Sequence, residues 1–176
     1  MEFRKIIIDS PDFKEAWQIL DSSFPEDEKR DLSQQKEVFK KDNYSFISIY
    51  DDTLIGIVTI WHLDGFAFIE QFAVKKEWRN KGYGVKILKE LEGKYNKIIL
   101  EMEFPETELQ KRRLSFYQKA GFILNLYPYK QPPYSEDKKS VNCLIMSYPK
   151  KISKKKFPNI RKILHKEVYN LVDSLI

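Results

Sequence analysis

The spacing of hydrophobic residues changes about midway along the chain, and this change limits the folds open to it. Three successive runs, at 45–50, 54–61 and 66–74, have the alternation and β-branched content of strands. An Asp-Gly pair at 64–65 separates the last two runs, and Asp-Gly is a strong signal for a two-residue hairpin turn. The middle of the chain therefore predicts an antiparallel meander.

Helical and strand-like segments alternate after this meander. Helical spacing covers 84–91 and 107–120, and strand-like runs lie at 98–100, 122–129 and 141–148. The segments expected ahead of the meander are a strand at 3–8, a helix that starts at Ser10-Pro11 and a short helix at 33–40. The pattern predicts an α/β (α+β) protein with a mixed central sheet of about seven strands, an antiparallel front and a βαβ element behind it.

Short motifs mark the ends of two of these helices. Ser10-Pro11 combines a serine suited to the N-cap with a proline at the first helical position. Thr107 and Gln110 have the spacing of a capping box, and Gly121 suits the left-handed position after a last helical turn. These motifs predict one helix that starts at Pro11 and another that runs from Thr107 to just before Gly121.

The positive charge of the chain is concentrated at its C-terminal end. The formal net charge is +5, yet residues 150–176 hold eight lysines and arginines against two acidic residues, and residues 1–149 carry a net charge of −1. Hydrophobic residues then recur at helical spacing, at Phe157, Ile160, Ile163, Leu164, Val168, Leu171, Val172 and Leu175. We therefore divide the chain into a domain at 1–149 and, at 150–176, a basic linker with an amphipathic helix. That helix is expected to pack on the domain or on a second subunit of a homodimer.

Composition excludes several classes of protein. The single cysteine, Cys143, cannot form an internal disulfide, and its apolar run at 141–146 indicates a core position. Two histidines and one cysteine do not make a zinc site, so no metal is expected. Apolar stretches stay well short of ~18 residues, and neither a secretory signal nor a nucleic-acid-binding motif is present. We expect a cytoplasmic protein with no membrane or nucleic-acid partner.

A basic loop that contains glycines joins a strand end to a helix start within residues 72–85. A helix N-terminus presents unpaired N–H groups and the positive end of the helix dipole. Gly82 and Gly84 lack side chains that would keep a phosphate at a distance, so the turn can bind an anion such as a pyrophosphate. The alternative is an ordinary strand-to-helix turn with a solvated loop, which the glycines alone do not exclude.

Two motifs in this order resemble those of one enzyme family. Arg79-x-x-Gly82-x-Gly84 resembles the acyl-CoA signature (R/Q)-x-x-G-x-(G/A) of the GNAT superfamily of N-acyltransferases. Residues 116–122, with the sequence FYQKAGF, resemble the helix-to-strand block FYxxxGF of the same superfamily. The resemblance covers roughly residues 3–148 and includes the order of the elements, so it favours the anion-binding interpretation of the loop.

The resemblance implies acetyl-CoA as the acyl donor. In this superfamily the fourth and fifth strands splay apart, and the pantetheine arm lies in the gap between them. The backbone of Phe72, Ala73 and Val74 would hydrogen-bond the pantetheine. The residues that would wrap the pyrophosphate are Arg79, Asn80, Lys81, Gly82, Tyr83, Gly84 and Val85. Gln110 stands where the family often has an asparagine that touches the donor.

The resemblance also implies two catalytic side chains. An alkyl ammonium must lose a proton before it attacks a thioester, which costs about 4.6 kcal/mol at pH 7. Glu70, four residues before Val74, is the candidate base, and strand alternation predicts it on the face of Phe72 and Val74. Tyr117 is the candidate acid for the departing thiolate. The alternatives are an ion-paired or solvated glutamate and a core tyrosine.

An acceptor site is expected next to these groups. Glu101 and Glu103 share one face of the strand that borders the cleft, and we predict that they attract a cationic amine. Tyr129 and Tyr134 would wall the pocket. A solvent-facing strand end and ordinary packing are the alternatives for these residues. The acceptor would be a primary amine on a small molecule or a protein.

Two functions follow from these observations. The first is an N-acetyltransferase that moves an acetyl group from acetyl-CoA to a primary amine by direct attack in a ternary complex. The second is a non-catalytic acyl-CoA-binding or interaction module, whose basic tail contacts nucleic acid or another partner. The presence of both Glu70 and Tyr117 favours the enzyme.

Overall fold

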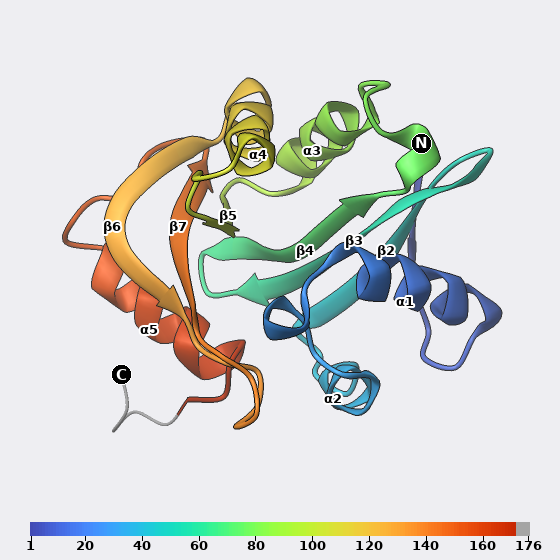
Figure 1. Ribbon diagram of the computed structural model, residues 1–176, viewed down its shortest axis with the longest axis horizontal. Coiled ribbons are helices and arrows are strands. Elements are labelled where there is room, and N and C mark those ends of the chain that lie inside the picture. The colour runs from blue at the N-terminus through green and yellow to red at the C-terminus, as the bar shows by residue number, and fades with distance from the viewer. Residues whose placement is uncertain (172–176) are drawn as a thin grey trace.

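The computed structural model describes residues 1–171, and its centre is a seven-stranded sheet in the order β1-β2-β3-β4-β5-β7-β6 (Figure 1). The strands are β1 (Glu2–Lys5), β2 (Tyr44–Asp51), β3 (Thr53–Leu63), β4 (Phe66–Val74), β5 (Ile98–Glu103), β6 (Ile123–Gln131) and β7 (Val141–Tyr148). The helices are α1 (Pro11–Ser23), α2 (Leu32–Val38), α3 (Tyr83–Lys94), α4 (Glu108–Lys119) and α5 (Phe157–Glu167), with 3-10 turns η1 (Glu26–Glu28) and η2 (Lys76–Trp78). The predicted mixed sheet of seven strands is confirmed.

The local motifs act as predicted at the helix starts. Ser10 is the N-cap of α1 and accepts a hydrogen bond from the Phe13 N–H at 3.3 Å. Thr107 and Gln110 form the complete capping box of α4. Gly121 has a φ of 98°, in the left-handed region that glycine adopts without strain. Each motif satisfies backbone groups that a helix end would otherwise leave unpaired.

The fourth and fifth strands form a fork. They are parallel and pair only over three residues, Ala67–Ile69 against Ile98–Leu100. Beyond Ile69, β4 stays paired with β3, while β5 stays paired with β7 as far as Glu103. The facing backbone edges of β4 and β5 are therefore unpaired beyond the fork, where an extended ligand can hydrogen-bond to them.

A β-bulge in β4 lies directly at the fork. Thr59 pairs with Gln71 and Ile60 with Ile69, so Glu70 is the extra residue. The bulge turns Glu70 to the face of Trp61, whose Nε1 donates to the Glu70 Oε2 at 2.9 Å. The predicted alternation is therefore wrong at this point, because it placed Glu70 on the opposite face, with Phe72 and Val74. Those two residues pack in the cluster beneath α3 and α4.

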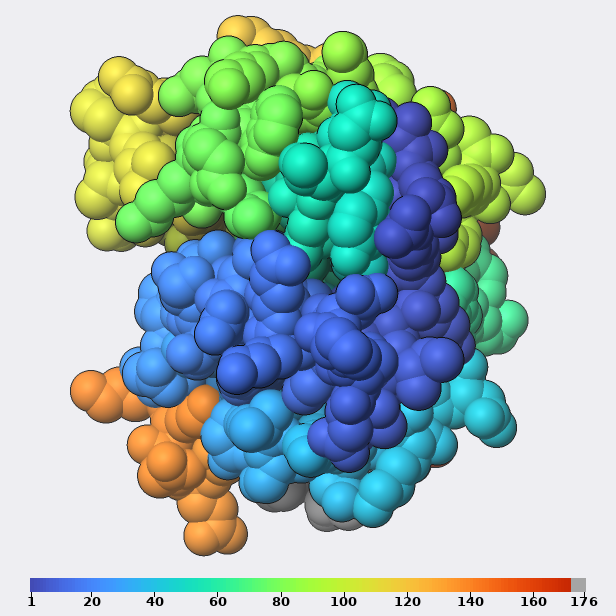
Figure 2. Space-filling model, turned by 90° about the vertical axis from the view of Figure 1, so that its right-hand side faces the viewer, coloured from blue at the N-terminus to red at the C-terminus, as the bar shows by residue number. Residues whose placement is uncertain are grey.

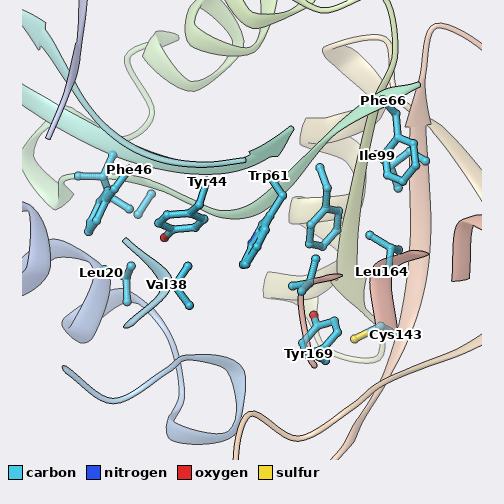
Figure 3. Close-up of a cluster of buried hydrophobic side chains, with 14 of the residues drawn as sticks. Leu20, Val38, Tyr44, Phe46, Trp61, Phe66, Ile99, Cys143, Leu164 and Tyr169 are labelled. Carbon is cyan, nitrogen blue, oxygen red and sulfur yellow. The ribbon is translucent and has the colours of Figure 1, made fainter. Parts of the chain in front are cut away.

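Helices cover both faces of the sheet (Figure 1). One cluster of buried side chains joins the sheet to α1, α2 and α5, and Figure 3 shows Trp61, Leu164 and Tyr169 among its members. The second cluster joins the opposite face to α3 and α4, through residues such as Leu88 and Tyr117. The gap between β4 and β5 connects the two faces.

The C-terminal helix packs on the domain, one of the two arrangements expected from its apolar stripe. Phe157, Ile160 and Leu164 are buried, and the Phe157 ring stacks on Tyr127 with centroids 4.6 Å apart. Helix α5 ends at Glu167, earlier than the apolar pattern suggested, and Val172 and Leu175 lie outside the described residues. The division of the chain at residue 149 stays a prediction. Within residues 1–171, no helix is long and apolar enough to cross a membrane.

Candidate active site

The loop after β4 forms a strained turn into α3. The Arg79 Nε donates to the Val74 carbonyl at 2.8 Å, and Asn80 and Gly82 have φ values of 60° and 82°. The N–H of Lys86 is the first in the helix to bond back, to the Gly82 carbonyl at 3.2 Å. The N–H groups of residues 83–85 thus lack helical acceptors at the positive end of the helix dipole, which is suited to a phosphate.

Gly84 lets α3 approach α4 closely. A Cβ added at Gly84 would lie 2.9 Å from the Cε2 of Phe116, a distance that real Cβ contacts essentially never show. The Phe116 ring in turn stacks near Phe72 of β4, with centroids 6.3 Å apart. The second glycine of the motif is therefore required by packing as well as by access to the backbone.

A cleft of about 620 Å³ runs along the fork. Figure 2 shows its surroundings: the loop after β4 (green) and α4 (yellow) lie above the end of α1 and η1 (blue). The predicted donor residues that line it are Phe72, Ala73, Val74, Arg79, Asn80, Gly82, Gly84 and Val85. The carboxylates that line it are Glu28, Glu70, Glu101 and Glu103. The cleft therefore joins an anion-binding helix start to an acidic region.

Three predicted donor residues lie outside this cleft. The Tyr83 hydroxyl donates to Asp51 at 2.9 Å, and the Lys81 Nζ lies 4.9 Å from the ring centroid of Trp78. The Gln110 Oε1 accepts the N–H of Thr107 at 2.8 Å in the capping box. Gln110 lines a neighbouring cavity of about 780 Å³ instead. Because the Gln110 side chain caps α4, it does not line the cleft where the donor contact was expected.

Tyr117 lies on α4 and lines the cleft. Burial raises the pKa of its hydroxyl to about 12, Arg113 lowers it and Glu103 raises it. Among residues 1–171, no group hydrogen-bonds this hydroxyl. The phenol is therefore protonated at neutral pH and free to donate to an atom of a bound ligand.

Glu70 is fully engaged by its neighbours. The Arg30 Nη1 donates to its Oε1 at 2.5 Å, the Tyr134 hydroxyl to the same oxygen at 3.1 Å, and Trp61 to its Oε2. Both partners of the ion pair are buried, with side chains 4% and 1% exposed. Burial opposes the charge of Arg30, but Glu70 holds the pKa of the guanidinium above its ordinary value. This environment does not favour the predicted role of Glu70 as the base.

Glu101 is the first residue of β5 beyond the fork, and no cation neutralises it among the described residues. Its Oε1 accepts a short hydrogen bond from Tyr129, and its Oε2 accepts one from Tyr169 at 2.7 Å. Burial raises the pKa of the carboxyl to about 7, against the two tyrosine hydrogen bonds that lower it, and nearby Glu70 raises it further. The group therefore changes charge close to neutral pH.

The two remaining carboxylates, Glu28 and Glu103, line both the cleft and the neighbouring cavity. Glu103 is ion-paired with Arg113. Glu28 lies on η1, and burial raises the pKa of its carboxyl to about 7, with a smaller contribution from Glu103. The predicted acceptor residues are thus brought together, although Tyr129 lines the neighbouring cavity rather than the cleft.

Sequence patterns missed three residues of this region. Arg30 lies 40 residues from its partner Glu70, and Tyr169 lies 68 residues from Glu101. Glu28 belongs to an acidic loop whose place beside the sheet is set only by the fold. No local motif marks such long-range contacts, although the apolar stripe after residue 157 predicted that this segment packs on the domain or on a second subunit.

A forked mixed sheet with an anion-binding helix start is the architecture of an acyl-CoA-dependent acyltransferase. The family model for the acetyltransferase (GNAT) family matches residues 11–122, and the chain belongs to this family of acetyltransferases. A GNAT-family protein from Bacteroides thetaiotaomicron is 35% identical, with a TM-score of 0.92 over 98% of this chain and 100% of that one. No curated protein matches the sequence.

More distant solved structures share the fold. A spermidine N-acetyltransferase from Vibrio cholerae, in complex with CoA and spermine, is 13% identical with a TM-score of 0.60, over 83% of this chain and 93% of that one. An aminoglycoside 6'-N-acetyltransferase complexed with coenzyme A is 17% identical with a TM-score of 0.59, over 84% and 96%. The predicted family and enzyme class are confirmed.

Proposed function

We propose that this protein transfers an acetyl group from acetyl-CoA to the primary amine of a small cationic molecule by direct attack in a ternary complex. The observation that carries the proposal is the cleft itself. One end holds the N-terminus of α3, the other holds four carboxylates, and the unpaired edges of β4 and β5 lie between them.

The residues at the donor end fit acetyl-CoA. The edge of β4 that faces away from β3 at residues 72–74 has no strand partner among residues 1–171 and would hydrogen-bond the amides of the pantetheine arm, as an added strand does in a sheet; the Val74 carbonyl also accepts from Arg79. The free N–H groups of residues 83–85 would hold the pyrophosphate. Gly84 keeps side-chain atoms away from this point, and Arg79 fixes the loop by its bond to Val74.

The reaction needs three changes at the fork. A neutral amine attacks the thioester carbonyl carbon and forms a C–N bond, and the C–S bond then breaks. Tyr117, protonated and without a partner among the described residues, would donate its proton to the leaving sulfur. The products are an N-acetylated amine and CoA, and two protons leave the original ammonium nitrogen.

The acidic end favours a cationic acceptor. Glu28 and Glu101 line the cleft without a salt bridge among residues 1–171, and a bound ammonium would supply a direct cationic partner. The cleft has room for a small molecule. The spermidine N-acetyltransferase from Vibrio cholerae, which shares this fold, was solved in complex with spermine, and this agrees with a small polycation as the acceptor.

A panel of amines tests this function. The release of free CoA from acetyl-CoA would be measured with polyamines, aminoglycosides, amino acids and lysine-containing peptides. We expect turnover with at least one small polycation and none with a neutral alcohol analogue of the same length. Tight acetyl-CoA binding without turnover on any amine would contradict the proposal and favour the non-catalytic module.

A further inference from the structure

We propose that Glu101 accepts the proton of the acceptor ammonium, and that Tyr169, supplied by the segment after α5, is a positioning residue that holds the Glu101 carboxyl in place. This inference rests on the proposed acetyltransferase function and deepens it. It gives the β5 glutamate the role that sequence reasoning gave to the β4 glutamate.

The fork places both glutamates where the chemistry must occur. The last pair between the two strands is Ile69 with Leu100, so Glu70 and Glu101 are the first residue of each strand after they separate. Because of the bulge, both face the side of the sheet that carries Trp61, Tyr129 and Tyr169. An amine that reaches a thioester in the gap between the strands would pass both carboxylates.

The hydrogen bonds distinguish the two glutamates. Glu70 accepts from Arg30, Tyr134 and Trp61, and a proton added to it would leave the buried Arg30 cation uncompensated. Among residues 1–171, Glu101 accepts only from two neutral hydroxyls, so its protonation leaves no buried cation without its partner. Glu101 can therefore take up a proton without breaking a buried ion pair, and Glu70 cannot.

The other carboxylates of the cleft are less suited to the role. Glu103 is paired with Arg113, as Glu70 is with Arg30. Glu28 forms no salt bridge among residues 1–171, but Arg113 lowers its pKa, and it is partly exposed and also lines the neighbouring cavity. Glu28 is better placed to attract the acceptor, and it is the competitor that an experiment must exclude.

The segment after α5 hydrogen-bonds to Glu101 and to Arg30, the ion-pair partner of Glu70. The Val168 carbonyl accepts from the Arg30 Nη2 at 2.8 Å, and the next residue, Tyr169, donates to Glu101. Lys41 of the turn before β2 donates to the Asn170 Oδ1 at 2.8 Å. Three successive residues are thus tied to the body of the domain, and the middle one reaches the proposed base.

Three hydroxyls, one thiol and one ion-paired carboxylate face Glu101. They are Glu70 of β4, Tyr129 of β6, Tyr134 of the loop that follows, Cys143 of β7 and Tyr169. Burial raises the pKa of all three tyrosines and of the cysteine well above its ordinary value. The carboxylate of Glu70 is ion-paired with Arg30.

The proton balance is complete without another reactant. The ammonium gives one proton to the Glu101 carboxylate and becomes a neutral amine. After the C–N bond forms, the nitrogen loses a second proton, which replaces the one that Tyr117 gives to the sulfur. Glu101 then releases its proton to solvent, so each turnover yields the amide, CoA and one proton.

The pH dependence of turnover tests the inference. We expect kcat/KM of the wild-type protein to fall below about pH 7, because the base must be unprotonated. Glu101→Gln should lower kcat by roughly 10²–10⁴-fold and remove this acidic limb, with little change in the Kd for acetyl-CoA. Tyr169→Phe removes a hydrogen bond that favours the carboxylate, so the limb should move up by about one pH unit.

Matched variants separate the alternatives. Glu28→Gln should raise the acceptor KM and keep the acidic limb. The carboxyl 13C NMR titration of Glu101, in the wild type and in Tyr169→Phe, reports the same pKa change without turnover and carries the test if Glu101→Gln fails to fold. The inference would be overturned if the acidic limb of the kcat/KM profile survived in Glu101→Gln. It would also be overturned if the limb moved only in Glu28→Gln, or if it were unchanged in Tyr169→Phe. A wild-type protein that binds acetyl-CoA but acetylates no amine would instead overturn the proposed function itself.

Discussion

At the scale of single residues, the glycines of the donor loop were the most readable feature. Gly82 needs its positive φ to enter α3, and Gly84 needs the absence of a Cβ beside Phe116. Both requirements are local, so a sequence motif can carry them. The anion-binding interpretation of the loop depends instead on the N–H groups of residues 83–85, which have no helical acceptor.

Gly84→Ala should weaken acetyl-CoA binding. The added Cβ would meet the Phe116 ring at 2.9 Å and push the start of α3 away from α4. Overpacking of this kind costs about 1–3 kcal/mol, so we expect a loss of roughly 5- to 150-fold in affinity, measured by calorimetry. Gly93→Ala is the matched control in the same helix, since its added Cβ meets nothing within 4 Å. Equal affinities in the two variants would contradict this account of the loop.

Arg30 and Tyr169 show what single residues in a sequence do not reveal. Each reaches the site from a distant part of the chain, and Arg30 also binds the Val168 carbonyl, 138 residues away. Their importance comes from the burial of the carboxylates they contact, which exists only in the folded protein. Glu70 was therefore identified as a site residue, with an ion-paired glutamate as the alternative, but its partner Arg30 was not foreseen.

At the scale of elements, the order and type of the segments followed from the sequence, and the irregularities did not. Hydrophobic periodicity identified seven strands, and capping residues identified the starts of α1 and α4. The bulge at Glu70 was missed because regular alternation assumes one residue per position. That single extra residue decides which face of the sheet carries the carboxylate.

The C-terminal segment contributes core as well as site residues. Its buried members include Ile152, Phe157, Ile160, Leu164 and Val168. Each large apolar side chain contributes about 1.5–3 kcal/mol when fully buried, so together they approach the ~5–15 kcal/mol by which a whole domain is stable.

Removal of residues 150–176 should therefore lower the Tm by tens of degrees or prevent cooperative unfolding, followed by circular dichroism. A variant with Lys151, Lys154 and Lys155 changed to Gln is the control, because these side chains are exposed and their loss should leave the Tm nearly unchanged. A truncated chain that keeps the wild-type Tm and the wild-type oligomeric state would show that the segment is not part of the domain.

At the scale of the whole molecule, the positions of the charges are more informative about substrate binding than the net charge is. The lysines at 150, 151 and 154–156 are exposed, and the 149 residues before residue 150 carry a net charge of only −1. Within those residues, the helix start at the donor end and the carboxylates at the acceptor end give the cleft opposite polarity at its two ends. A donor with phosphates and an acceptor with an ammonium would each be drawn to its own end.

The central claim is direct transfer across the fork, with both substrates bound together. Cys143, the chain's only thiol, lines the cleft, but burial raises its pKa well above the ordinary value, so it is poorly suited to carry an acetyl group. Initial rates measured while both acetyl-CoA and an active amine are varied test the claim most directly. We predict double-reciprocal lines that intersect, with no acetylated protein before the amine is added. Parallel lines, together with an acetyl-enzyme detected by mass spectrometry, would contradict it.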